Sequence, residues 1–224
     1  MAAINIVAIL GFVITLLCCN PISSLIREKG KEENSQDKSY LVLLWIIFGA
    51  AFVVRIIAAA VYKGNETDMN CFLIWSQNVF EDGLSKFYLS DSFHDYPPGY
   101  MYILYIVGAI RALFSWAWDS KASIVLTKLP AIIADMFTAY LIFKIASKRL
   151  KKSGAAFLSA VYLFCPMIIL DSAVWGQTDS VFTVFMVLMC YLITEKKLIP
   201  SYFVFAIGIL IKPQSLFFTP VLIC

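Results

Sequence analysis

The chain has 224 residues, of which 61% are hydrophobic and 15% charged, and it carries a formal net charge of +3 with a mean hydropathy of +0.81. One soluble core could not hide this much apolar surface from water, so the composition excludes an ordinary soluble domain. The Lys and Arg residues lie in short clusters beside apolar runs, which is typical of orientation signals at membrane helix ends and not of a nucleic-acid-binding face. We therefore expect an all-α, polytopic membrane helix bundle.

Cysteine and histidine usage gives no sign of a metal site or a disulfide framework. Five of the six cysteines lie within or at the ends of apolar runs, and only Cys71 lies in a polar loop. His94 is the single histidine, which argues against a His-based metal site or a catalytic triad. The sequence therefore gives no indication of a cofactor and leaves a divalent metal open.

The N-terminal segment is expected to add one membrane helix ahead of the main module. Residues 4–25 are largely apolar, and the linker at 27–38 has four Lys or Arg, which predicts a cytoplasmic position. We assign residues 1–39 to this extra helix and linker, and residues 40–224 to a membrane module. The first run of that module, residues 40–62, is long enough to span the membrane, so the loop after it should lie outside the cytoplasm.

That loop, residues 63–96, is acidic, with six Asp or Glu against two Lys. Apolar side chains recur at helical spacing over 68–84, which predicts an amphipathic helix lying on the membrane. Thr67 could cap the start of this helix, and Gly83 could end it. A Tyr-Pro-Pro-Gly sequence at 96–99 then fixes an extended backbone before the next apolar run.

Two apolar runs, 100–115 and 123–146, separate this loop from the basic cluster at 148–152, which should be cytoplasmic. An outer loop and an inner cluster require an odd number of crossings, so one run does not span or one is broken. Charged residues and Pro130 interrupt 123–146, which makes it the better candidate for two short half-helices. The alternative, a basic cluster on the outer side, is disfavoured by the charge rule.

The remaining segments alternate across the membrane. We expect 155–170 to cross outward, 181–193 to return and 201–211 to cross outward again, with Lys212 at its outer end. The final run, 216–224, is too short to span, so we expect the module to be truncated or its last helix to be incomplete.

Polar residues of separate loops fall on the same predicted outer face. Each has an ordinary explanation: Asp68 as a solvated acid at a helix N-terminus, Trp175 as an interfacial anchor, and Lys212 as a snorkelling charge. Their convergence on one face favours a site. Within the helices, Arg55, Lys128 and Asp135 are either a structural intramembrane pairing or part of a functional charge path.

Five motifs, taken in order, resemble the GT-C superfamily of polyprenyl-phosphate-sugar-dependent glycosyltransferases, in particular the ALG-type glucosyltransferases and the bacterial and GPI-type mannosyltransferases. The motifs are Asp68 at the start of the outer helix, Asp95-Tyr96-Pro97-Pro98, the segment 128–135, Trp175-Gly176-Gln177-Thr178-Asp179, and Lys212-Pro213-Gln214. The resemblance covers residue 55 to the C-terminus. It implies a GT-C-like membrane fold in which the acid of the first outer loop, here Asp68, is the catalytic base.

The implied reaction is the inverting transfer of a hexosyl residue, mannose or glucose, from a polyprenyl-phosphate sugar to an acceptor hydroxyl on the extracytoplasmic face. Phosphate leaves with little protonation, so one base suffices, unlike glycoside hydrolysis with its second carboxyl acting as acid. Lys212 is the candidate cation for the donor phosphate, and Asp95 is the second choice for the base. The expected substrate-binding residues are Asp95, Tyr96, Trp175, Gln177, Asp179, Lys212 and Gln214.

The expected partners are the lipid-linked sugar donor, a glycan, lipid or protein acceptor, and membrane lipid, with no nucleic acid. The protein would be an integral protein of a bacterial plasma membrane or of a eukaryotic endoplasmic reticulum membrane, with its active face on the extracytoplasmic or luminal side. Two other functions remain open: a lipid or solute transporter, and a non-catalytic membrane subunit or fragment. Binding of a polyprenyl-phosphate sugar would separate an enzyme from a transporter, and turnover would separate it from a non-catalytic subunit.

Overall fold

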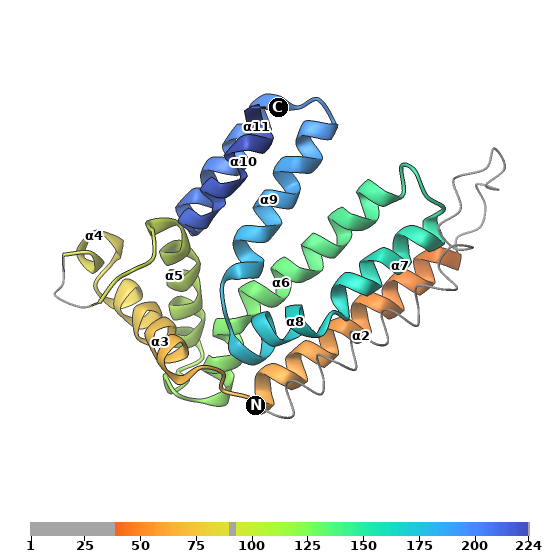
Figure 1. Cartoon of the computed structure of the whole chain (residues 1–224). Helices are drawn as coiled ribbons and strands as arrows, with labels where there is room; N and C mark the ends of the chain where they lie inside the picture. The colour runs from red at the N-terminus through yellow and green to blue at the C-terminus, as the bar shows by residue number, and fades with distance from the viewer. Residues whose placement is uncertain (1–38, 90–92, 224) are drawn as a thin grey trace.

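The computed structural model describes residues 39–89 and 93–223, and every regular element within these ranges is a helix (Figure 1). This confirms the predicted all-α fold. The expected helix at 4–25 and the basic linker at 27–38 lie outside the described residues. The elements are α2 (Ser39–Val61), α3 (Glu66–Glu81), α4 (Leu84–Phe87), α5 (Pro98–Leu113), α6 (Lys121–Ala146), α7 (Lys152–Leu163), α8 (Pro166–Ile169), the π-helix η1 (Leu170–Trp175), α9 (Asp179–Thr194), α10 (Leu198–Ile211), the 3₁₀-helix η2 (Pro213–Phe218) and α11 (Thr219–Ile223).

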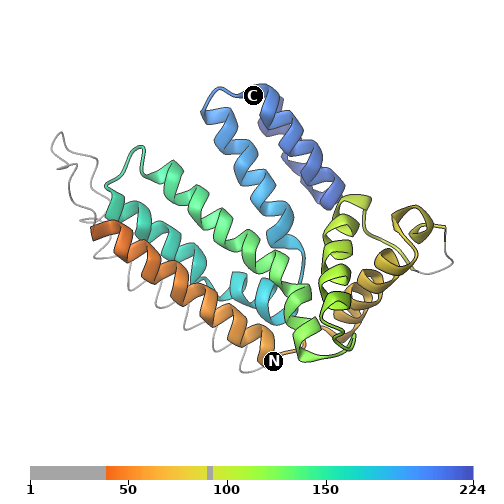
Figure 2. The ribbon, with the colours of Figure 1, turned by 180° about the vertical axis from the view of Figure 1, so that it is seen from behind.

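The long helices lie side by side as a fan, and the α3–α5 pair stands at one end of it (Figures 1 and 2). Helix α6 packs against α2, α7 and α9, and α9 packs in turn against α10. Helix α5 joins the two parts, because it packs against α3, α6 and α10. The chain segments that enter α3, precede α5, precede α9 and follow α10 meet at the same end.

Two of the described helices are long and apolar enough to cross a membrane, Tyr40–Val61 and Lys121–Ala146, and a bent pair made of Lys152–Leu163 and Pro166–Trp175 is a third candidate. The bend of 51° falls where Pro166 interrupts the run that we expected to cross as one helix. The protein is accordingly an integral membrane protein.

Helix α6 corrects one expectation, because it is a single helix of 26 residues and not two half-helices. Pro130 removes only one backbone hydrogen bond, and the polar side chains of Lys128 and Asp135, both fully buried, find partners in other elements. Helix α5 has 16 residues, about 24 Å at the usual helical rise, which is short of a hydrocarbon core of roughly 30 Å. Helices α9 and α10, which we expected to cross, are equally short, with 16 and 14 residues, so length alone does not single out α5 as the run that does not span.

Helix α3 differs from the expected amphipathic helix in its start and in its surroundings. The N-cap is Asn65 and not Thr67: the Asn65 side-chain oxygen accepts hydrogen bonds from the backbone N–H groups of Thr67 and Asp68 at 3.0 and 3.2 Å. The helix ends at Glu81, ahead of Gly83, whose φ is +84°. Its apolar face is buried inside the protein, mainly against α5, so it does not face lipid; the buried side chains are Met69, Phe72, Leu73, Trp75 and Val79.

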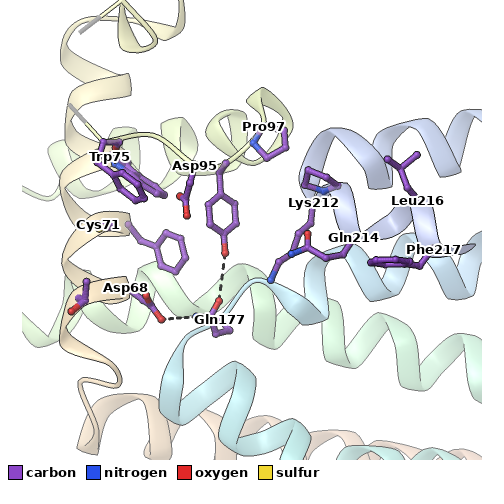
Figure 3. A pocket seen from close by; sticks show the side chains of 15 residues that line it. Asp68, Cys71, Trp75, Asp95, Pro97, Gln177, Lys212, Gln214, Leu216 and Phe217 are labelled. Carbon is purple, nitrogen blue, oxygen red and sulfur yellow. Dashed lines mark hydrogen bonds between the residues drawn. The ribbon is translucent and has the colours of Figure 1, made fainter. Parts of the chain in front are cut away.

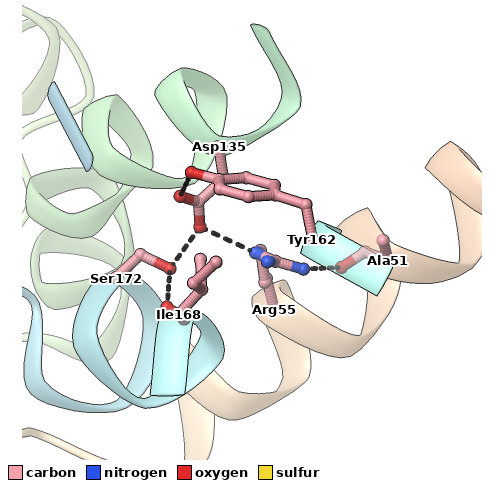
Figure 4. A network of polar contacts seen from close by, with 6 residues as sticks. All are labelled: Ala51, Arg55, Asp135, Tyr162, Ile168 and Ser172. Atoms are coloured by element: carbon pink, nitrogen blue, oxygen red, sulfur yellow. Dashed lines mark hydrogen bonds and ion pairs between the residues drawn. The ribbon is translucent and has the colours of Figure 1, made fainter. Parts of the chain in front are cut away.

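A buried ion pair holds the middle of the fan together (Figure 4). Arg55 of α2 donates to Asp135 of α6 at 3.0 Å, and both side chains are fully buried. The Asp135 carboxylate also accepts hydrogen bonds from Ser172 of η1 at 2.6 Å and from Tyr162 of α7 at 3.3 Å. The expected pairing is thus confirmed for Arg55 and Asp135, but Lys128 takes no part in it.

Candidate active site

A cavity of about 860 Å³ opens where α3, the segment before α5, the loop before α9 and the α10–η2 junction meet (Figure 3). Six of the eight residues that the sequence singles out line it: Asp68, Asp95, Tyr96, Gln177, Lys212 and Gln214. The other two, Trp175 and Asp179, lie behind the lining, where each contacts a lining residue. Four separate segments of the chain therefore supply one site.

Asp68 lies in the first turn of α3, where the positive end of the helix dipole favours a carboxylate. Its Oδ2 atom accepts hydrogen bonds from Trp175 Nε1 at 2.8 Å and from Gln177 Nε2 at 2.6 Å. Within residues 39–89 and 93–223, no protein donor contacts the other oxygen, Oδ1. The carboxylate is therefore fixed by one oxygen and has the second available to accept a proton.

A short chain of hydrogen bonds continues from Asp68 across the cavity wall. Gln177 Oε1 accepts from the Tyr96 hydroxyl at 3.5 Å, and that hydroxyl accepts from Thr178 Oγ1 at 3.2 Å. Burial raises the pKa of Tyr96 above its usual value, although the Thr178 hydrogen bond and the Lys212 charge act in the opposite direction. Tyr96 thus remains a neutral hydrogen-bond donor near pH 7.

Lys212 lies at the C-cap of α10, in extended backbone directly before Pro213. Its ammonium forms an ion pair with Asp179, the first residue of α9, and lies 5.9 Å from the ring centroid of Tyr96. The Lys212 side chain is 14% exposed and lines the cavity. A partly buried cation therefore stands across the cavity from Asp68, with its charge balanced by Asp179.

Sequence reasoning missed an aromatic wall on α3. Cys71, Phe72 and Trp75 line the cavity at three, four and seven residues after Asp68, which is one face of a helix. Helical spacing from Asp68 could have found them, but the apolar periodicity assigns Phe72 and Trp75 to a membrane-facing side and gives no role to Cys71. Leu216 and Phe217 of η2 give the Lys212 side of the cavity an apolar surface and were also missed.

Trp175 does not line the cavity itself. Its indole N–H is bound to Asp68, and its side chain is 47% exposed beside the cavity. Trp175 thus contacts Asp68, and Asp179 contacts Lys212. Among the described residues, no group of three or more His, Cys, Asp or Glu is arranged to hold a metal ion.

A family model described as dolichyl-phosphate-mannose-protein mannosyltransferase matches residues 95–224, which is 130 of the 224 residues. No curated protein and no solved structure matches the chain significantly. The matched region includes Asp95, Gln177 and Lys212 but begins after Asp68. It confirms the resemblance to the GT-C superfamily. Because more than half of the chain is matched, the chain belongs to the dolichyl-phosphate-mannose-protein mannosyltransferase family.

Proposed function

We propose that this protein transfers a hexosyl residue, mannose or glucose, from a polyprenyl-phosphate sugar to an acceptor hydroxyl on the extracytoplasmic face, with inversion at the anomeric carbon. Family membership supports a glycosyltransferase with a lipid-phosphate-linked donor. The observation that carries the proposal is the position of Asp68, a carboxylate with one oxygen held by two donors and the other available in a cavity that also contains a cation.

The reaction needs one base and one stabilised leaving group. Asp68 Oδ1 takes the proton of the acceptor hydroxyl while the acceptor oxygen attacks the anomeric carbon. The bond from the anomeric carbon to the phosphate oxygen breaks, and its electron pair goes to the polyprenyl phosphate. Lys212 offsets the negative charge that develops on this oxygen, in a site partly shielded from water.

The cavity lining divides in a way that suits this donor (Figure 3). Leu216 and Phe217 lie on the same side as Lys212, so the first isoprene units of the lipid could leave along an apolar surface next to the phosphate site. Gln177 and Gln214 offer amide groups to sugar hydroxyls. Asp179 forms an ion pair with Lys212. We expect the donor phosphate to bind Lys212 beside Asp179 or to displace Asp179 from it.

The test is Asp68→Asn in the full-length protein, assayed with a panel of mannosyl and glucosyl polyprenyl phosphates for release of polyprenyl phosphate. Asparagine keeps the size and the hydrogen bonds but cannot take a proton, so transfer should fall by roughly a hundredfold or more while donor binding is retained. Asp95→Asn is the comparison variant, since Asp95 is the other acid lining the cavity and the second choice for the base. Near-normal turnover in Asp68→Asn together with loss in Asp95→Asn would transfer the role of base to Asp95.

A further inference from the structure

Lys128, on α6, is a fully buried lysine whose ammonium contacts no carboxylate among the described residues. Its three N–H donors are instead used by three backbone carbonyls: Tyr62 O at 2.6 Å, Ala173 O at 3.0 Å and Val174 O at 2.9 Å. A buried charge is tolerated only when such groups replace its water shell. The Lys128 ammonium is thus fully coordinated by main chain.

The three carbonyls belong to the ends of two helices. Tyr62 directly follows α2, and Ala173 and Val174 lie in the last turn of η1. Helix C-termini leave carbonyls without intrahelical partners and carry partial negative charge, so a cation placed between two of them attracts both. Lys128 therefore ties the end of α2 to the end of η1.

Both helix ends lead within a few residues to the groups that hold the base. The chain runs from Tyr62 through the Asn65 cap to Asp68, and from Val174 to Trp175 and Gln177, the two donors to Asp68.

The two loops also touch directly. Gly64, with φ +97°, packs so closely that an added Cβ would lie 2.2 Å from Trp175 O. Gly176, with φ +88°, packs against the side chains of Met69 and Lys128, since an added Cβ would lie 2.5 Å from Met69 Cε and 3.1 Å from Lys128 Cε.

We propose that Lys128 is a positioning residue for the transfer reaction, which holds the loops after α2 and η1 in the register that keeps Trp175 and Gln177 on Asp68. The proposal rests on the proposed function, with Asp68 as the base. Lys128 does not line the cavity, so it acts on the reaction through these two loops and not through the substrate. Misplacing a reacting group by about 1 Å can cost roughly a hundredfold in rate.

The kinetic test compares Lys128→Met with Lys144→Met, which removes an exposed lysine from the same helix away from the cavity. We expect Lys128→Met to lower kcat by roughly tenfold to a hundredfold with the donor KM within about twofold, and Lys144→Met to leave both unchanged. In a Gln177→Leu background, Lys128→Met should add little further loss, because both changes release the same carboxylate. Losses that multiply independently, or a loss confined to KM, would overturn the proposal.

Hydrogen exchange of the ligand-free protein provides a readout that does not depend on turnover. Lys128→Met should speed exchange in the backbone of residues 62–68 and 173–178, whereas α9 and α10 should exchange as in the unmodified protein. The exchange rates of these segments in Lys128→Gln, which retains one donor group, should fall between those of Lys128→Met and those of the unmodified protein. Faster exchange throughout all helices would show that Lys128 stabilises the whole fold and would contradict the positioning role. Absence of transfer in the unmodified protein would instead contradict the proposed function, and the exchange result would still decide whether Lys128 joins the loops.

Discussion

Cys71 and Asp68 lie on the same face of α3, and both line the cavity. Burial raises the pKa of the Cys71 thiol, and the negative charges of Asp68 and Asp95 raise it further. The thiol is therefore neutral around pH 7, and it becomes a reactive thiolate only at higher pH than an ordinary cysteine. Its reactivity reports the charge in the cavity without any substrate.

We expect the rate of Cys71 alkylation to rise with pH, and the midpoint of this rise to lie at higher pH than for an ordinary cysteine. Asp68→Asn removes one of the two negative charges, so it should move this curve to lower pH, while the larger effect of burial remains. Asp82→Asn, on the exposed end of α3, is the matched control and should leave the curve in place. Mass spectrometry of the Cys71 peptide measures the rate, and identical curves for all three proteins would show that Asp68 exerts no field at Cys71.

Single residues of the site were largely predictable, but their contacts were not. Asp68, Asp95 and Lys212 could be placed on one face because each lies beside the end of an apolar run, and they do line one cavity. The two donors to Asp68 lie 107 and 109 residues away, a distance that no local pattern encodes. Lys128 could be noticed as an expensive intramembrane charge, but its three backbone partners exist only in the folded chain.

Helices α2, α6, α7 and η1 are held to one another by the Arg55–Asp135 pair and its neighbours (Figure 4). Removing one member of a fully buried ion pair leaves an uncompensated charge, which is far more costly than replacing both members by apolar groups. The contacts among these helices thus depend on the pair being complete.

Asp135→Asn should therefore lower the stability of the protein by about 3–5 kcal/mol, because Arg55 remains buried without its counter-charge. The double change Arg55→Met with Asp135→Leu should recover a large part of this loss. Thermal unfolding in a fixed detergent measures all three proteins. A double variant that is no more stable than Asp135→Asn would argue against charge compensation as the role of the pair.

The junction of α10 and η2 places Lys212 at a helix end with its backbone fixed by Pro213. Lys212→Met should weaken binding of the polyprenyl-phosphate donor much more than binding of the acceptor, because only the donor carries the phosphate. Lys86→Met, which removes an exposed lysine of α4 outside the cavity, is the control. Donor affinity that is the same in both variants, measured by titration, would leave Lys212 with the sole role of pairing with Asp179.

The errors at the level of helices share one physical cause. The apolar face of α3 was assigned to lipid, yet Phe72 and Trp75 pack against protein. An amphipathic pattern is the same whether the apolar face meets a membrane or another helix, so periodicity alone could not separate the two. Likewise, Pro130 and the charges of α6 suggested a break, but partners supplied by other helices keep the helix whole.

In the whole molecule, the two ends of the fan differ in charge. The cavity with its acids lies at one end, and the basic residues around Lys148 lie in the turn between α6 and α7. Lys148 forms an ion pair with Glu195 in the turn between α9 and α10, so these two turns lie together. This segregation agrees with the rule that Lys and Arg accumulate on the cytoplasmic side.

We expect a cysteine introduced at Gln214 or Asp179 to be labelled by a membrane-impermeant thiol reagent added from outside, in a protein lacking Cys71. A cysteine at Arg149 should react only after the membrane is opened, because the charge rule predicts a cytoplasmic position for the basic turn. Intact cells or sealed vesicles of known orientation give the measurement. Labelling of position 179 from the cytoplasmic side alone would contradict an extracytoplasmic active face.

Gly64 and Gly83 stand at the two ends of α3, and both have positive φ, yet their surroundings differ. Backbone of the η1 end crowds Gly64, whereas an added Cβ at Gly83 would meet nothing within 4 Å. This contrast decides where the loop can accept foreign sequence. An epitope tag or reporter domain spliced in at Gly83 extends into open space, but the same insertion at Gly64 separates Asp68 from the groups that orient it.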